Sequence, residues 1–287
     1  AQLGPFEEEG HREAGRLAAR VVDFLVTNGE AMRLAALEAV RNGLQPDRVC
    51  VTYTTEDAAQ AVEGLLQPGA AILVKGAVET RLEEVVRRLL PDPGRASEWL
   101  VRQSPGWKAV QRKRPPRPTW VEIDLEAIAH NVRRIRELLD PSVRLMAVLK
   151  ADGYGHGAIK VARTALNNGA SWLGVACLSE ALTLREAGIE APILVLGYTP
   201  PWQARETVEN GVTAAVFSLE TVQALSRAGV EAGDPARVHV KVDTGMGRLG
   251  LLPPEVVPFI SEVRRLPGLV VEGLFTHFAA ADSADRR

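Results

Sequence analysis

The sequence predicts an α/β protein in which a small Rossmann-like parallel domain is followed by an incomplete (β/α)8 TIM-type barrel. Its 287 residues are enough for about two domains. Short apolar runs alternate with helical patterns, and turn residues bound these runs, as is typical of buried parallel strands. A stretch rich in Pro, Gly and Arg interrupts the alternation once, so we place one domain on each side of it.

The first domain is predicted over residues 1–91 and contains three strand-like runs. A helical pattern near 7–20 leads into "VVDFLVTNG", and the helix after it ends at Gly43, a residue that suits the end of a helix. The strand "RVCVTYT", a helix around 56–66, the strand "AAILVKG" and the helix "ETRLEEVVRRLL" complete the series. Three strands joined by helices predict a small parallel sheet.

Residues 92–117 are predicted to be a linker. Its basic residues are interpreted as part of a solvated connector rather than as a phosphate-binding tail, because aromatic residues between them are sparse. They are Lys108, Arg112, Lys113, Arg114 and Arg117.

Residues 118–287 are predicted to form the second domain. After the opening strand "TWVEIDL" and a helix over 125–138, six strand-like runs follow, separated by helical patterns. They are "RLMAVLKA", "WLGVAC", "PILVLG", "TAAVFS", "RVHVKVDTG" and "LVVEGLFTH". Eight strands of this kind would close a barrel. The alternative is an open doubly wound sheet.

Composition excludes several classes of function. Hydrophobic residues make up 46% of the chain and the net charge is -2, so no positive field exists to attract nucleic acid or an anionic membrane. No apolar run approaches the roughly 18 residues of a membrane span, and no charged segment followed by an apolar segment opens the given sequence, so a signal peptide is not expected. Cys50 and Cys177 are predicted to be reduced, buried thiols of a cytoplasmic protein without a metal site. Both ends look cut, so we interpret the chain as a piece of a longer protein.

Polar side chains stand at the ends of several predicted strands of the second domain, where βα architectures bind their ligands. We expect these strand ends to share one barrel mouth. The side chains are those of Lys150, Tyr198, Lys241, Asp243, Arg248 and His277.

Lys150 follows an apolar strand, and Gly153, Gly155 and Gly157 come directly after it. Dry surroundings favour a neutral amine, which attacks an aldehyde to give a Schiff base. The glycines allow the backbone to approach a ligand closely, and the hydroxyl of Tyr154 is placed to donate to a phosphate. An aldehyde that also carries a phosphate is pyridoxal phosphate, which is therefore the predicted cofactor. The alternative, a surface lysine at the start of a Gly-rich loop, is disfavoured by this neighbourhood.

Four motifs resemble those of alanine racemases, and they occur in the same order. "AVLKADGYGHG" is similar to the pyridoxal-phosphate attachment signature of that family. "WVEIDLEAIAHN" precedes it, and "KVDTGMGRLG" and "GLFTHFAAAD" follow it. The resemblance implies a fold-type III pyridoxal-phosphate barrel that is followed by a β-rich domain. It implies an isomerase that interconverts L-alanine and D-alanine.

The resemblance also implies roles for individual residues. Lys150 resembles the lysine that forms the aldimine with the cofactor and acts as one of two catalytic bases. Tyr154 matches the tyrosine that contacts the phosphate, and His277 matches the histidine that packs against the pyridine ring. Arg248 matches the arginine near the phenolic oxygen of the cofactor and the substrate carboxylate. Lys241 matches a lysine that is carbamylated in some members and orients that arginine.

The residues alone leave simpler interpretations open for Lys241 and His277. Lys241 is alternatively an ordinary lysine paired with a nearby carboxylate. His277 is alternatively a structural histidine hydrogen-bonded at a strand end. Asp243 is expected to cap a turn rather than to take part in catalysis.

Racemisation needs a proton-transfer group on each face of the cofactor. Lys150 supplies one of them, and the family's second base is a tyrosine from the β-rich domain of the partner subunit in a homodimer. None of the chain's tyrosines, Tyr53, Tyr154 and Tyr198, matches that base. We therefore expect these residues alone to be a poor racemase or an inactive piece of one.

Residues 1–91 resemble the C-terminal domain of Mur ligases. The stretches that carry the resemblance are "LGPFEEEGHREAGRLAA", "VVDFLVTNGEAMRLAALEAV" and "PGAAILVKGAVETRLEEVVRRLL". They are closest to the ligase that adds D-alanyl-D-alanine to UDP-MurNAc-tripeptide with ATP and Mg. "AVET" replaces that family's Ser-Arg-Gly-type turn, which weakens a substrate-contact role for this loop. Lys75, at the end of a buried-looking strand, either faces a ligand or is a surface lysine, and His11 is interpreted as a helix-start histidine. No GxxxxGK[ST] loop is present.

The order of the two resemblances implies a bifunctional enzyme. A ligase that consumes D-alanyl-D-alanine would stand directly before an enzyme that makes D-alanine. Such a fusion would join two cytoplasmic steps of peptidoglycan precursor synthesis and cell wall biogenesis.

Three other interpretations remain. The barrel is another enzyme of the same cofactor class, either a broad amino-acid racemase or a decarboxylase. It is a protein that binds pyridoxal phosphate without turnover. Or it is a structural fragment whose open sheet edges lead to aggregation or to dependence on partners.

Overall fold

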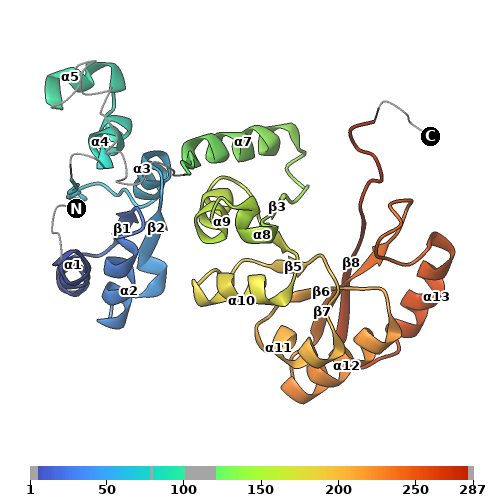
Figure 1. Cartoon of the computed structure of the whole chain (residues 1–287). Helices are drawn as coiled ribbons and strands as arrows, with labels where there is room; N and C mark the ends of the chain where they lie inside the picture. The colour runs from blue at the N-terminus through green and yellow to red at the C-terminus, as the bar shows by residue number, and fades with distance from the viewer. Residues whose placement is uncertain (1–5, 78–79, 101–120, 284–287) are drawn as a thin grey trace. The chain divides into compact units, whose positions relative to one another are not determined.

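The computed structural model describes residues 6–77, 80–100 and 121–283 (Figure 1). The Cα atoms group into two compact units, Ala1–Arg133 and Arg134–Arg287. The first part of the predicted linker contains a 3-10 turn at Pro93–Arg95 and the short helix α5 (Ala96–Trp99). The rest of it, with the basic cluster that begins at Lys108, lies outside the described residues. The division at residues 91 and 118 stays a prediction.

The first unit contains a two-stranded parallel sheet with helices. β1 pairs with β2 from Leu25↔Val49 to Asn28↔Thr52. The side chain of Thr54 accepts a hydrogen bond from Asp57 N at 3.0 Å, which caps the helix after β2. The elements are α1 (Glu7–Val21), β1 (Leu25–Asn28), α2 (Arg33–Arg41), β2 (Val49–Thr52), α3 (Thr55–Glu63) and α4 (Glu83–Leu89).

The prediction of a third strand in this unit is wrong, because residues 70–76 form no strand. The side chain of Leu73 is 89% exposed. Ile72 and Val74 instead line a shallow apolar hollow with Val86 of α4. A strand is stable only where a neighbouring strand accepts its backbone hydrogen bonds, and this apolar run has no such neighbour among the described residues. Lys75 is exposed, as a surface lysine.

The second unit is built from strands and helices that alternate along the chain. Helix α7 (Leu125–Leu138) crosses the boundary between the units, and it has the bounds that the sequence predicts. The other main elements are β3 (Met146–Val148), α8 (Lys150–Tyr154), α9 (Ala158–Asn167), β4 (Trp172–Val175), α10 (Leu178–Glu186), β5 (Ile193–Val195), α11 (Ala204–Glu209), β6 (Thr213–Val216), α12 (Leu219–Ala232), β7 (Ala236–Val242), α13 (Pro253–Val263) and β8 (Leu269–Thr276).

All six predicted strands of the series form, and they make one parallel sheet in the order β3-β4-β5-β6-β7-β8. Each strand therefore pairs with the next one in the sequence, as in a (β/α)8 barrel that has not closed. The opening run "TWVEIDL" is not a strand in its described part, because residues 121–124 are irregular and α7 begins at Leu125.

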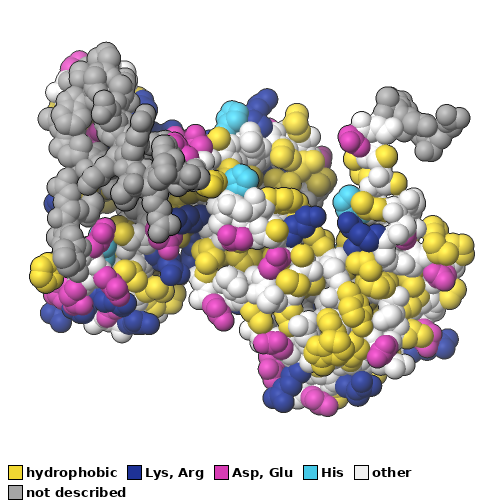
Figure 2. Space-filling view, in the orientation of Figure 1, with side chains coloured by type: hydrophobic (Ala, Val, Ile, Leu, Met, Phe, Trp, Pro, Cys, Tyr) yellow, Lys and Arg dark blue, Asp and Glu magenta, His cyan; other side chains and the backbone are white. Residues whose placement is uncertain are grey.

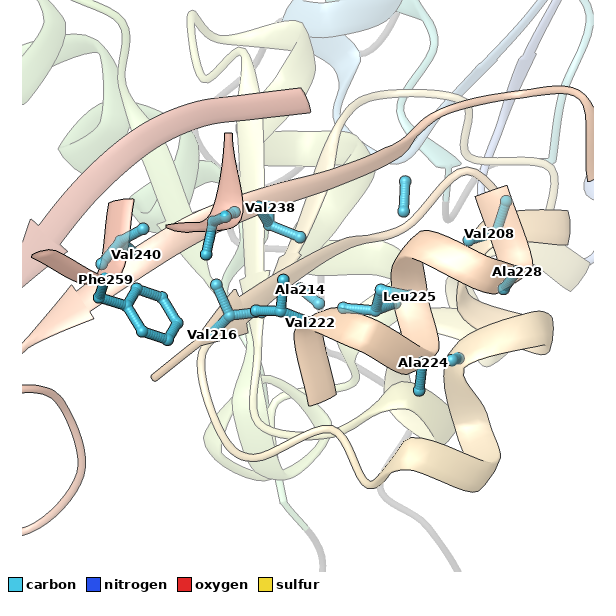
Figure 3. Packing of buried hydrophobic residues seen from close by; sticks show 13 residues of the cluster. Val208, Ala214, Val216, Val222, Ala224, Leu225, Ala228, Val238, Val240 and Phe259 are labelled. Atoms are coloured by element: carbon cyan, nitrogen blue, oxygen red, sulfur yellow. The ribbon is translucent and has the colours of Figure 1, made fainter. Parts of the chain in front are cut away.

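The core of this unit lies between the sheet and its helices. β4, β5 and β6 are buried along their whole length, which explains why their sequences are continuous apolar runs. In Figure 3, Val222 and Leu225 of α12 lie against Val216 of β6 and Val238 of β7. Because all parallel strands end at the same edge, this packing fixes the place where the strand-end side chains lie.

Two further predictions concern the surface of the molecule. No helix among the described residues is long and apolar enough to cross a membrane. Both cysteines are free, but Cys50 is half-buried and Cys177 is exposed at the start of α10, so the prediction of buried thiols is wrong.

Candidate functional site

Lys150 lies immediately beyond the C-terminal end of β3. The strand leads into Leu149, which is 2% exposed and whose N–H donates to the carbonyl of Gly174 on β4 at 2.7 Å. Lys150 is the first residue of the short helical segment α8. Its backbone is thus held by the sheet on one side, while its side chain reaches the strand-end edge.

The turn after Lys150 is left-handed. Ala151, Asp152, Gly153 and Tyr154 have φ values of 54°, 54°, 63° and 57°. This conformation costs roughly 1–2 kcal/mol for each residue other than glycine. Such a turn persists only where its surroundings hold it.

Two carboxylates hold this turn. Asp152 Oδ1 accepts the N–H of Ala158 at 2.7 Å, which ties the turn to the start of α9. Glu180 Oε1 accepts the N–H of Ala151 at 2.8 Å, and its Oε2 accepts the N–H of Ala176 at 2.8 Å. Neither residue is predicted as a site residue from the sequence. The one signal for Glu180 is an acidic residue in the first turn of a helix that directly follows a strand.

Lys150 is half-buried rather than dry, so the burial expected from its apolar strand is only partly met. Its Nζ lies 5.7 Å from the centroid of the Tyr154 ring, and the Tyr154 side chain is 60% exposed. Gly155 and Gly157 have no heavy atom within 4 Å of the position that a Cβ would occupy. Lysine, tyrosine and open glycine backbone therefore lie together at this end of the sheet.

Lys241 lies at the end of β7 and is 5% exposed. Its Nζ donates to the carbonyl of Leu196, which follows β5, at 2.8 Å, and it lies 5.4 Å from the centroid of the Phe275 ring. Burial lowers the pKa of Lys241, as does the nearby charge of Arg248, while Asp243 opposes the shift. Within the described part of the chain no ion pair includes Lys241, so the simple carboxylate pairing considered for it is not found.

The loop after β7 is closed mainly by its own hydrogen bonds, with one side-chain bond of 2.7 Å between Thr244 and Thr276 at the end of β8. Asp243 Oδ1 accepts the N–H groups of Gly245 and Gly247, each at 3.0 Å. These bonds, with the N–H of Gly247 first, lower the pKa of Asp243. The N–H of Asp243 donates to Leu251 O at 2.8 Å, and the N–H of Leu251 donates to Lys241 O at 2.9 Å. Asp243 thus caps the turn, as the sequence predicts.

This loop brings Lys241, Asp243 and Arg248 to one small hollow with His277, the residue after β8. The ring Nδ1 of His277 donates to Phe278 O at 2.8 Å. Arg248 is exposed at the rim. Figure 2 shows dark blue basic side chains beside a cyan histidine in this part of the second unit. The hollow is cationic apart from Asp243, so it suits an anionic ligand.

The predicted site residues therefore form two groups on one edge of the sheet. Lys150 and Tyr154 belong to the end of β3, and Lys241, Arg248 and His277 belong to the ends of β7 and β8, with β4, β5 and β6 between them. Tyr198 follows β5, and its ring centroid lies 6.1 Å from that of Phe217. In the described segments, no group of three potential ligands is arranged to bind a metal ion.

In the first unit, His11 lies within α1 and is 7% exposed. Its Nε2 is 3.8 Å from the Glu7 carboxylate, one helical turn earlier. It is thus a buried helix histidine.

The fold and these side chains define an open βα-barrel domain with its amines and guanidinium at the C-terminal ends of its strands. Residues 123–287 match the family described as alanine racemase, N-terminal domain, and the chain belongs to this family. It is 53% identical over 169 residues to the alanine racemase of Desulfovibrio desulfuricans, an alignment that covers 59% of this chain and 46% of that protein. It is 54% identical over 166 residues to that of Symbiobacterium thermophilum, covering 58% and 44%.

Solved structures give the same result. An alanine racemase of Clostridium difficile in complex with cycloserine superimposes with a TM-score of 0.58 at 41% identity, covering 60% of this chain and 48% of that one. A histidine racemase from Leuconostoc mesenteroides superimposes with a TM-score of 0.53 at 37% identity, covering 56% and 43%. The chain spans less than half the length of these relatives.

Proposed function

We propose that the second unit is the cofactor-binding part of a pyridoxal-phosphate-dependent alanine racemase, an isomerase that interconverts L-alanine and D-alanine. The observation that carries the proposal is the position of Lys150 at the end of β3, in a chain of this family. The relatives named above as alanine racemases support the choice of alanine.

The residues present fit pyridoxal phosphate. A primary amine, a tyrosine hydroxyl and glycine backbone open to a neighbouring group lie together after β3. The hollow after β7 supplies cationic side chains for an anionic cofactor and a substrate carboxylate. When bound, the cofactor withdraws the electron pair that deprotonation leaves on the α-carbon of the substrate.

Each residue then has a proposed role. Lys150 holds the cofactor through Nζ and moves a proton on one face of the α-carbon. Tyr154 donates its hydroxyl to the phosphate, and His277 packs against the pyridine ring. Arg248 binds near the phenolic oxygen and the substrate carboxylate, and Lys241, carbamylated, orients Arg248. A buried amine whose pKa is lowered is suited to carbamylation, because the neutral amine is the form that reacts with carbon dioxide.

The residues of this chain provide a proton-transfer group for one face only. We propose that the second base comes from a partner subunit of a homodimer in the cytoplasm, and that the chain alone turns over poorly. The histidine racemase among the similar structures supports a second candidate, a racemase of broader amino-acid range. A substrate panel with the intact parent protein separates the two.

The decisive experiment traps the cofactor. The chain is incubated with pyridoxal phosphate, reduced with borohydride, digested and mapped by mass spectrometry. We expect the label on the peptide that contains Lys150, and its loss in Lys150→Ala. Lys160→Ala, a change of an exposed lysine on the next helix, is the matched control and should label as the wild type does. A label that lands on another lysine contradicts the proposal.

We also propose that the first unit derives from the C-terminal domain of a Mur ligase that adds D-alanyl-D-alanine to UDP-MurNAc-tripeptide with ATP and Mg. Its parallel β1–β2 pair and surrounding helices support this, with the sequence motifs. The intact parent should incorporate labelled D-alanyl-D-alanine into the nucleotide product only when ATP and Mg are present. Absence of incorporation by an otherwise folded parent contradicts the ligase assignment and leaves the racemase assignment untouched.

A further inference from the structure

Glu180 joins the two loops that flank the site of Lys150. Its carboxylate accepts one N–H from the residue after Lys150 and one from Ala176, which follows β4, with both distances 2.8 Å. The two bonds use different oxygens. The loop after β3 and the loop after β4 are therefore fixed to a single side chain.

This is not the usual use of a glutamate at this position. Glu180 is the third residue of α10, after the N-cap Cys177. In a capping box such a glutamate accepts the N–H of the N-cap residue itself. Here it reaches the residue before the N-cap and a second loop 29 residues away in sequence. The side chain thus binds the two loops rather than the first turn of its own helix.

The bond to Ala151 falls at the first residue of the left-handed turn, where φ is 54°. Ala151 has no glycine's freedom, so this conformation depends on what binds its N–H. The next residue of the same turn, Asp152, is tied through its side chain to the N–H of Ala158. Lys150 directly precedes the turn. Its side chain is a flexible four-carbon stem, so the protein sets the position of the amine mainly by fixing the Lys150 backbone.

We propose that Glu180 is a positioning residue for Lys150: by binding Ala151 N–H it holds the turn that sets the direction in which Nζ leaves the sheet. The inference rests on the proposed function, because it concerns the amine that would hold the cofactor. Small displacements of a reacting group lower rates by large factors, so the anchor beside Lys150 controls how fast the cofactor attaches.

Glu180→Gln tests the proposal because it changes one oxygen and nothing in volume. Glutamine keeps one acceptor, and its NH2 group faces one of the two backbone N–H groups. Glu186→Gln, the same change at an exposed position of the same helix, is the matched control. The full chain is used throughout.

Two measurements are made on each variant. The first is the rate of borohydride-trapped labelling of the Lys150 peptide by pyridoxal phosphate. The second is amide hydrogen exchange without cofactor, read peptide by peptide. For Glu180→Gln we expect labelling roughly tenfold slower, within the range that small misplacements cost, and faster exchange confined to residues 149–158 and 174–177. Glu186→Gln should match the wild type in both.

The outcomes distinguish the positioning role of Glu180 from the proposed function. If the wild type labels at Lys150 and Glu180→Gln labels equally fast, the positioning role is overturned and the proposed function stands. If the wild type does not label at Lys150, the proposed function fails, and amide exchange of Glu180→Gln alone tests whether Glu180 holds the turn. Faster exchange confined to residues 149–158 and 174–177 then supports this role, and unchanged exchange overturns it. Acceleration spread over the whole second unit shows a general role in folding and also overturns the proposal.

Discussion

The loops after β3 and β7 both present cationic side chains at the same edge of the sheet, but they are held in different ways. The loop after β3 is a left-handed turn whose start is bound by Glu180 of helix α10, in addition to its own bond between Asp152 and Ala158. The loop after β7 is fixed by its own Asp243 and by backbone bonds between its two ends. The start of the first loop thus depends on a neighbouring helix, whereas the second loop is largely self-contained, with one side-chain bond to β8.

This difference has consequences for the two lysines. Lys150 stands outside its strand, half-buried, and takes its direction from a turn that α10 supports. Lys241 stands inside its strand and is 5% exposed, so packing fixes it before the loop begins. The amine that we propose to hold the cofactor is thus the adjustable one, and the buried amine forms part of the rigid frame.

The largest expected effect is that of Gly250→Ala in the self-contained loop. Gly250 has φ +133°, and a Cβ there would lie 2.6 Å from Asp243 N and 2.8 Å from Val242 C. Backbone atoms cannot move aside without opening the loop, so we expect a loss of about 3 kcal/mol in the free energy of unfolding. Urea unfolding measures it.

Gly247→Ala is the control within the same loop. Its φ is +67°, but no heavy atom lies within 4 Å of the added Cβ. We expect a loss of only about 1 kcal/mol, from the left-handed conformation alone. Equal losses at the two positions would show that the loop is not closed as tightly as these distances indicate.

Gly155→Ala probes the supported loop. Gly155 has φ +80° and open space around a Cβ, so the stability loss should again be about 1 kcal/mol. Gly188→Ala, with φ +76° and equally open surroundings, should cost the same. Only Gly155→Ala should also slow the labelling of Lys150, because the cofactor is expected to approach that open backbone. Equal labelling of both variants argues against a cofactor at this position.

Lys241→Met tests the rigid frame through pH. Burial lowers the pKa of Lys241 in the folded chain, so between that pKa and the ordinary value of about 10.4 the unfolded chain binds more protons. Wild-type stability should therefore rise with pH through this window. The methionine variant lacks this titratable amine, so its stability relative to the wild type should fall as pH rises through the window. The fall should be on the order of 1 kcal/mol or less, because solvent screens the charge.

Urea unfolding at several pH values measures this difference. Lys160→Met, at an exposed lysine, is the control and should follow the wild type at every pH. A variant at position 241 whose pH dependence equals that of the wild type would mean that the amine is not desolvated.

The same comparison shows what the sequence can predict. All six strands of the second unit are predicted correctly, and for β4 to β6 the reason is that they are buried along their whole length and read as continuous apolar runs. Lys150 and His277 come just after apolar strands, Lys241 is near the end of one and Arg248 lies in the loop after it, and parallel topology then places them at one edge. The turn role of Asp243 is predicted from the two glycines that follow it.

The remaining features depend on contacts that no local pattern encodes. The carbonyl partner of Lys241 lies 45 residues earlier, and Glu180 binds a loop 29 residues away. The apolar run 70–76 has the composition of a strand, but strand formation needs a partner edge, and the run instead lines an open hollow beside α4 with Leu73 89% exposed. Local propensity predicts an extended chain there but does not tell whether a neighbouring strand is available to pair with it.

The smallest expected effect is that of Asp243→Asn. The loop's N–H groups lower the pKa of Asp243, so the carboxylate contributes stability that is present above its ordinary pKa and is lost as pH falls through its folded pKa. The difference between wild type and variant should therefore be constant near neutral pH and vanish in acid. It should stay below the effect of Gly155→Ala, since the carboxylate is open to solvent and competes with water for the same N–H groups.

Asp234→Asn is the control, since Asp234 is an exposed carboxylate near Arg237 and holds no loop. It should show little change at either pH. Because Asp243 serves the loop that carries Arg248, amide exchange of residues 244–250 should accelerate in Asp243→Asn while that of residues 149–158 stays unchanged. Acceleration in both loops would show that they are coupled, and the distinction between a supported loop and a self-contained loop would then be wrong.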